Sequence, residues 1–72
     1  MARYVLNSQE YDGHHEVHNA DAHCESETYP RPEHQIDLGL HNNCSEAIEE
    51  AQGQYLLWDI DGCAWCTNCH TK

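Results

Sequence analysis

The last dozen residues hold the densest group of reactive side chains in the sequence. Cys63, Cys66, Cys69 and His70 fall within eight positions, a density that packing alone does not require. Two thiols spaced C-x-x-C can bind one metal ion, because the turn between them brings the sulfurs to about 3.7 Å, the edge of a tetrahedral zinc site. The tail therefore predicts half of a metal site, and the other half must come from upstream.

Candidate ligands for that other half lie between residues 14 and 24. In the run HHEVH at 14–18, alternate residues of a strand share a face, so His14, Glu16 and His18 are expected to lie together. His18 can form a second ligand pair with Cys24, or with the adjacent His23, at the end of this strand. The run comes close to the H-E-x-x-H of zinc proteases but does not match it, because position 19 is Asn. We therefore exclude a protease.

The length and composition of the chain call for a cross-link of some kind. A single domain of 72 residues with 39% hydrophobic residues, no Phe and a mean hydropathy of -0.87 has too thin a core to be stable without help. The cysteine count is odd, at five, seven histidines accompany it, and no secretory leader is recognisable. We expect reduced thiols, a cytoplasmic location and a bound metal. No apolar run approaches the roughly 18 residues that cross a membrane.

The formal net charge of -10 bears on possible partners. Because a surface this acidic repels phosphate backbones, direct nucleic-acid binding is not expected. The charge can simply serve solubility. Mimicry of DNA is a sharper interpretation that only the charge supports.

Local patterns predict a few short elements around these ligands. Residues 3–6 and 14–18 are expected to pair as a hairpin around Asp12-Gly13, with residues 1–13 partly flexible, and 19–33 is expected to be irregular. Alternation over 36–40 predicts a third strand with Ile36, Leu38 and Leu40 facing inward.

One helix is expected after Asn43, which serves as its N-cap, with Glu46 completing a capping box. Its apolar stripe faces the sheet and consists of Cys44, Ala47, Ile48, Ala51 and Tyr55. Cys44 is interpreted as a packing residue rather than a ligand because it lies on that stripe. The fold class predicted is α+β, a small two- or three-stranded antiparallel sheet on one helix, with residues 1–72 forming a single domain.

The order of these motifs resembles a family of small, uncharacterised bacterial Cys/His-rich proteins. Their pattern is HEVH, a cysteine, a proline segment, LG, NCxxA, a GCxxC and CHT, and it is matched here from His15 to Thr71. The second half is also similar to the metal-binding domain of the Ada DNA-repair protein. The resemblance implies a zinc-stabilised mini-domain whose ligands are His18, Cys24, Cys63 and Cys66, with His23, Cys69 and His70 as substitutes. The Ada activity is not carried over, because the basic residues that contact DNA are missing.

Two other chemistries fit the same tail. Cys66, Cys69 and His70 match C-x-x-C-H, the attachment signature of c-type haem, which would make the protein an electron carrier. C-x-x-C can also serve thiol redox exchange. The preferred interpretation is a non-catalytic domain with structural Zn²⁺ that binds an unidentified protein partner, for which Tyr11, Tyr29 and Trp65 are exposed candidates. Four protein ligands would leave the zinc no open position for catalysis.

Overall fold

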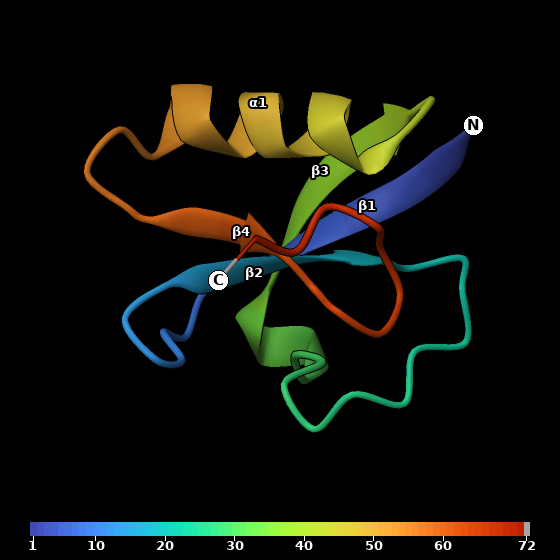
Figure 1. The fold of residues 1–72 in the computed structure, drawn as a ribbon, viewed down its shortest axis with the longest axis horizontal. Helices are drawn as coiled ribbons and strands as arrows, with labels where there is room; N and C mark the ends of the chain where they lie inside the picture. The colour runs from blue at the N-terminus through green and yellow to red at the C-terminus, as the bar shows by residue number, and fades with distance from the viewer. Residues whose placement is uncertain (72) are drawn as a thin grey trace.

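The protein is one four-stranded sheet with one helix on one of its faces (Figure 1). The computed structural model describes residues 1–71. The elements, in chain order, are β1 (Ala2–Asn7), β2 (His15–Asn19), the 3-10 turn η1 (Pro32–His34), β3 (Gln35–His41), α1 (Cys44–Gln54) and β4 (Ile60–Gly62). The strand order is β3-β1-β2-β4. The α+β class is confirmed.

The prediction of a small antiparallel sheet is wrong in its last strand. β1 pairs antiparallel with both β2 and β3, but β4 adds to the edge of β2 in parallel. The chain leaves β3, crosses over the sheet as α1 and returns along β2, so the direction of β4 follows from the helical connection. The result is a mixed sheet of four strands.

The hairpin is confirmed at the expected turn. Asp12 and Gly13 have φ angles of 51° and 84°, a left-handed pair that glycine and aspartate tolerate better than most residues. Val5 stands opposite His18 and Leu6 opposite Val17. This register sends Leu6 and Val17 toward the helix and His18 toward the other face of the sheet.

The helix begins where the capping signal placed it. The Asn43 side chain accepts a hydrogen bond from the Glu46 N–H at 3.0 Å, while the Glu46 carboxylate accepts from the Asn42 N–H at 3.0 Å, one residue earlier than in a standard capping box. The predicted stripe packs against the sheet, with Ala47 and Ala51 fully buried. Together with the buried side chains of the strands, it forms the core, which comprises Tyr4, Leu6, Val17, Leu38, Cys44, Ala47, Ala51 and Ile60.

The third strand alternates as predicted only as far as Leu38. Leu38 is buried, whereas Leu40 is 53% exposed, so the inward placement of Leu40 is wrong. The β1–β3 register shifts between Tyr4 and Val5, and Gly39 adopts a φ of 83° beside this bulge. Because a bulge inserts one residue, every side chain beyond it moves to the opposite face.

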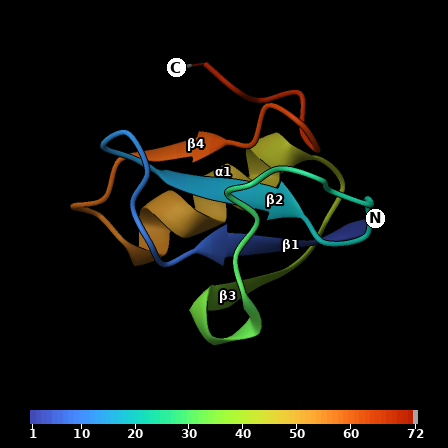
Figure 2. The same cartoon turned by 90° about the horizontal axis from the view of Figure 1, so that it is seen from below.

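The second face of the sheet is covered by the segment 20–34, which is irregular up to η1 and crosses β2 and β1 in Figure 2. That face is polar, because Asn7, His14, Glu16, His18 and Asp61 are all buried there or at its edge. Hydrogen bonds tie the segment to the sheet. One example is the bond from the Asn7 amide to the Thr28 carbonyl at 2.8 Å. The sheet therefore has an apolar core on one side and a buried polar layer on the other.

A disulfide joins Cys44, at the start of α1, to Cys69 in the tail. The expectation that all five thiols are reduced is therefore wrong for this pair. Cys44 is buried on the helix stripe as predicted, but its sulfur is bonded instead of merely packed. The cytoplasmic location stays a prediction.

Candidate metal centre

Four side chains from separate parts of the chain meet on the polar side of the sheet. His18 lies in β2, Cys24 in the irregular segment that follows, and Cys63 and Cys66 in the turn directly after β4. One ligand atom from each residue can be chosen so that all four lie within 4.8 Å of one another. The structure thus brings together the four residues that the resemblance implied, and they constitute a possible metal site.

Three of the distances within this group match the edges of a zinc tetrahedron. The Cys24 and Cys63 sulfurs are 3.8 Å apart, and His18 Nδ1 lies 3.8 Å from Cys24 Sγ and 3.7 Å from Cys66 Sγ. Zn–S bonds near 2.3 Å and Zn–N bonds near 2.0 Å predict edges of about 3.6 to 3.8 Å in a tetrahedron. The remaining pairs lie within the 4.8 Å that encloses the group, so an ion could contact all four atoms after a local adjustment of the side chains.

The pairing of β2 with β4 positions the C-x-x-C turn. The Cys63 N–H donates to the Val17 carbonyl at 2.9 Å, which places the turn beside His18. Backbone N–H groups then point at the sulfurs, from Trp65 to Cys63 Sγ at 3.4 Å and from Asn19 to Cys66 Sγ at 3.3 Å. Such donors stabilise thiolates and orient them toward a metal.

Burial dominates the electrostatics of the group. Burial raises the pKa of the Cys66 thiol, and its hydrogen bond with Cys24 and the charge of Cys63 add to this effect. Burial also lowers the pKa of His18, which outweighs the opposite influence of Glu16, so the imidazole is neutral and its nitrogen can ligate. A metal ion would reverse the thiol shift by pairing with the thiolates directly.

Glu16 forms a second layer beneath His18. Its Oε1 lies 3.6 Å from His18 Nε2, and its Oε2 lies 3.4 Å from Nε2 of His14. The Thr28 hydroxyl donates to the same Oε1, so the carboxylate is held in place. Neither ring nitrogen of His14 nor His18 Nε2 has a hydrogen-bond partner in residues 1–71. A carboxylate next to the outer nitrogen of a ligating histidine fixes the ring and raises its basicity. The sequence analysis placed His14, Glu16 and His18 on one face of a strand but assigned no role to Glu16.

The substitute ligands lie elsewhere. His23 is exposed, Cys69 is in the disulfide, and His70 Nδ1 lies 3.0 Å from the Gly62 carbonyl and 3.3 Å from Asp61. The haem interpretation requires Cys66 and Cys69 to bond one porphyrin with His70 as a ligand to iron. Because the structure places these three residues in three different interactions, it argues against that alternative.

Gly62 is a requirement that the sequence analysis missed. A Cβ at this position would lie 2.7 Å from Thr67 Oγ1, 2.9 Å from Cys69 Cβ and 3.0 Å from the Cys69 carbonyl carbon. The tail therefore folds back over β4 at a distance that only glycine permits. The sequence signal is the glycine directly before Cys63.

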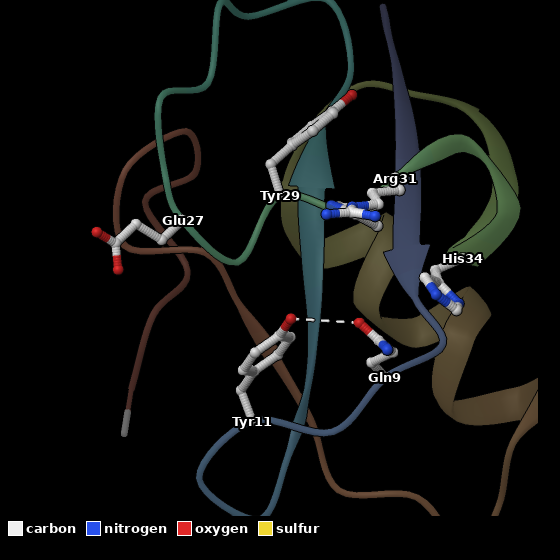
Figure 3. A pocket seen from close by; sticks show the side chains of 7 residues that line it. Gln9, Tyr11, Glu27, Tyr29, Arg31 and His34 are labelled. Carbon is white, nitrogen blue, oxygen red and sulfur yellow. Dashed lines mark hydrogen bonds between the residues drawn. The ribbon is translucent and has the colours of Figure 1, made fainter.

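A separate hollow of about 340 Å³ is lined by none of the four candidate ligands. Its labelled residues, shown in Figure 3, are Gln9, Tyr11, Glu27, Tyr29, Arg31 and His34. Tyr29, which lines this hollow, also makes an edge contact with the His18 ring at 5.2 Å between centroids. In Figure 3 Glu27 points away from Arg31, and the Tyr11 hydroxyl donates to Gln9.

Comparison of the chain with protein-family models, curated proteins and solved structures found no match. The resemblance to the small bacterial family and to the Ada-type domain therefore stays a prediction. Within residues 1–71, no helix is long and apolar enough to span a membrane.

Proposed function

We propose that this chain is a non-catalytic zinc-binding domain in which Zn²⁺ is structural and which serves as a protein-interaction module. The observation that supports it most strongly is the convergence of three sulfurs and one imidazole nitrogen within 4.8 Å. Three cysteines and one histidine are a common ligand set of structural zinc sites. The soft thiolates favour zinc over magnesium or calcium, which prefer oxygen ligands.

The closed ligand set is the reason for assigning a structural role. Catalytic zinc sites keep one position for water, whereas four protein ligands fill the tetrahedron. Cys63 is buried and His18 is fully buried, so solvent reaches the ion from few directions. The ion would instead connect β2, the segment after it and the turn after β4. Metal binding of this kind contributes on the order of 10 kcal/mol to folding.

The interaction role is supported by what the fold leaves on the surface. Trp65 is 76% exposed although it lies in the turn that carries two ligands. An exposed tryptophan on a fixed backbone is a frequent anchor of protein interfaces. The resemblance to the Ada-type domain enters this proposal only for metal binding, because with a net charge of -10 the chain offers no basic surface for DNA.

Native and denaturing mass spectrometry with metal analysis of the same sample tests the zinc proposal. We expect one zinc per chain, which is lost on denaturation, and unfolding when a strong chelator is added. His18→Ala is expected to lose the zinc, whereas the matched variant His23→Ala keeps it, because the exposed His23 is not in the cluster. Likewise Cys66→Ser is expected to lose zinc and Cys69→Ser to keep it. A native chain without metal, or zinc retained in both His18→Ala and Cys66→Ser, would refute the proposal.

A further inference from the structure

A second hollow lies directly beside the candidate metal centre. It has a volume of about 510 Å³ and is lined by Glu25, Ser26, Glu27, Thr28 and Trp65. One wall is the segment that follows the ligand Cys24, and the other is the tryptophan between the ligands Cys63 and Cys66. Both walls are therefore attached to residues of the candidate metal site.

Contacts with the metal site and with Glu16 hold both walls. The Trp65 N–H donates to Cys63 Sγ at 3.4 Å, which fixes the backbone that carries the indole. On the other wall the Ser26 and Thr28 hydroxyls are 2.8 Å apart, and Thr28 donates to Glu16 beneath His18. A bound ion would hold both walls at once, so a ligand would enter a hollow that is already formed and would have less ordering entropy to overcome.

The lining groups are suited to an organic cation. Glu25 and Glu27 are exposed, and neither makes a hydrogen bond or ion pair within residues 1–71. Figure 3 shows that Glu27 turns away from Arg31, the nearest cation in sequence. The face of an indole attracts ammonium and guanidinium groups, and two free carboxylates beside it provide their counter-charge.

The charge of the whole chain supports the same class of ligand. Thirteen carboxylates face three Lys and Arg residues, and of these cations Arg3 is already paired with Asp37 at 3.0 Å. Such a field attracts basic partners and repels acidic ones. The long alkyl stem of a lysine or arginine can also lie against the apolar indole while its charged end reaches a carboxylate.

We propose that this hollow, which we call the Trp65 hollow, binds lysine or arginine side chains of a basic segment in a partner protein. The inference rests on the proposed function and deepens it, because it assigns the interaction surface and the chemistry of the partner. It also makes the interaction depend on the metal, since the ligands position both walls.

Binding of a short synthetic peptide of alternating lysine and glycine to the zinc-loaded protein tests the proposal, by calorimetry at low and at physiological salt. Two variants remove the recognition groups: Trp65→Ala, and the double variant Glu25→Gln with Glu27→Gln. Their matched controls are Leu57→Ala, which truncates a 99% exposed apolar side chain, and Glu49→Gln with Glu50→Gln, which removes the same charge from the exposed face of α1. Zinc content is measured in every sample.

We expect Trp65→Ala to weaken peptide binding about two- to fivefold and the Glu25 and Glu27 pair to weaken it about three- to tenfold. The controls are expected to change the affinity less than twofold. In the NMR spectrum of the wild-type protein, the indole N–H signal of Trp65, and not that of Trp58, is expected to shift on peptide addition. This measurement locates the peptide even where a variant loses zinc. Equal weakening by both glutamate pairs, or an unmoved Trp65 signal, would show attraction by the general field and overturn the proposal. A native protein without zinc would instead refute the proposed function.

Discussion

Removing the Cys44–Cys69 disulfide is expected to destabilise the domain even when zinc is bound. The bond joins the first residue of α1 to the tail across a sequence separation of 25. Closing a loop of that length in the unfolded chain removes conformational entropy worth about 3.5 kcal/mol at room temperature. For a domain of this size, such a loss lowers the melting temperature by about 15 to 25 °C.

Cys69→Ala is the suitable perturbation, because it breaks the cross-link and leaves the buried Cys44 side chain in the core. Gln52→Ala is the control, since it truncates an exposed side chain of α1 and keeps the bond. Thermal and urea unfolding are compared at one fixed concentration of free zinc, because bound metal itself shifts the midpoint. Adding a reductant to the wild-type protein is expected to reproduce the effect of Cys69→Ala.

A thiol count decides whether the reasoning is sound. After denaturation in chelator, the unreduced wild-type protein is expected to show three free thiols, those of Cys24, Cys63 and Cys66. Five free thiols, or equal unfolding midpoints for the wild type and Cys69→Ala, would refute the cross-link and its calculated contribution.

Two further predictions concern the tail and the layer beneath His18. Gly62→Ala is expected to lower the free energy of unfolding by about 1 to 3 kcal/mol, because the added Cβ would meet the Cys69 backbone. Gly53→Ala is the control: its Cβ meets open space within α1, so it is expected to raise the free energy of unfolding by up to about 1 kcal/mol. Urea unfolding compares the two variants. An equal response would refute the close approach of the tail. Glu16→Gln is expected to lower zinc affinity about 10- to 100-fold in competition with a chelator, because the carboxylate lies 3.6 Å from His18 Nε2. An unchanged affinity would show that Glu16 does not support the ligand.

The parts of the fold that the sequence could predict have local signals. The Asp12-Gly13 turn and the Asn43 cap each specify backbone geometry within a few residues, and the structure confirms both. The placement of Leu40 was wrong because alternation carries no information about a bulge. Only the pairing with β1 shows that Leu38 is the extra residue, since Val5 stands opposite Asp37 and Tyr4 opposite Gly39. β4 has three residues, too few to show a period, and its parallel partner lies more than forty residues away in sequence.

The candidate metal site likewise has one part that the sequence could predict and one part that it could not. Spacing alone brings Cys63 and Cys66 together, since a C-x-x-C turn is local. The choice of His18 over His23 depends on the face of β2 and on where the segment after it returns, which are tertiary properties. The sequence could not predict the pairing of Cys69 with Cys44 for a similar reason. The tail motif gave Cys69 two competing roles, as a substitute metal ligand and as a haem attachment site, and no local pattern relates it to the helix.

The disulfide and the candidate metal site both lie in the tail, which has little regular structure of its own. Beyond β4, Cys63 and Cys66 belong to the candidate metal site and Cys69 is bonded to α1, so three contacts three residues apart fix a segment without regular secondary structure. The metal would join residues as far apart as 48 positions, from His18 to Cys66, and the disulfide holds the next turn against the helix. Trp65 lies between the candidate ligands Cys63 and Cys66 and is 76% exposed. An exposed aromatic on a backbone held by both a disulfide and a metal would lose little entropy on binding, so the bonds proposed to compensate for a thin core would also prepare the surface proposed to bind a partner.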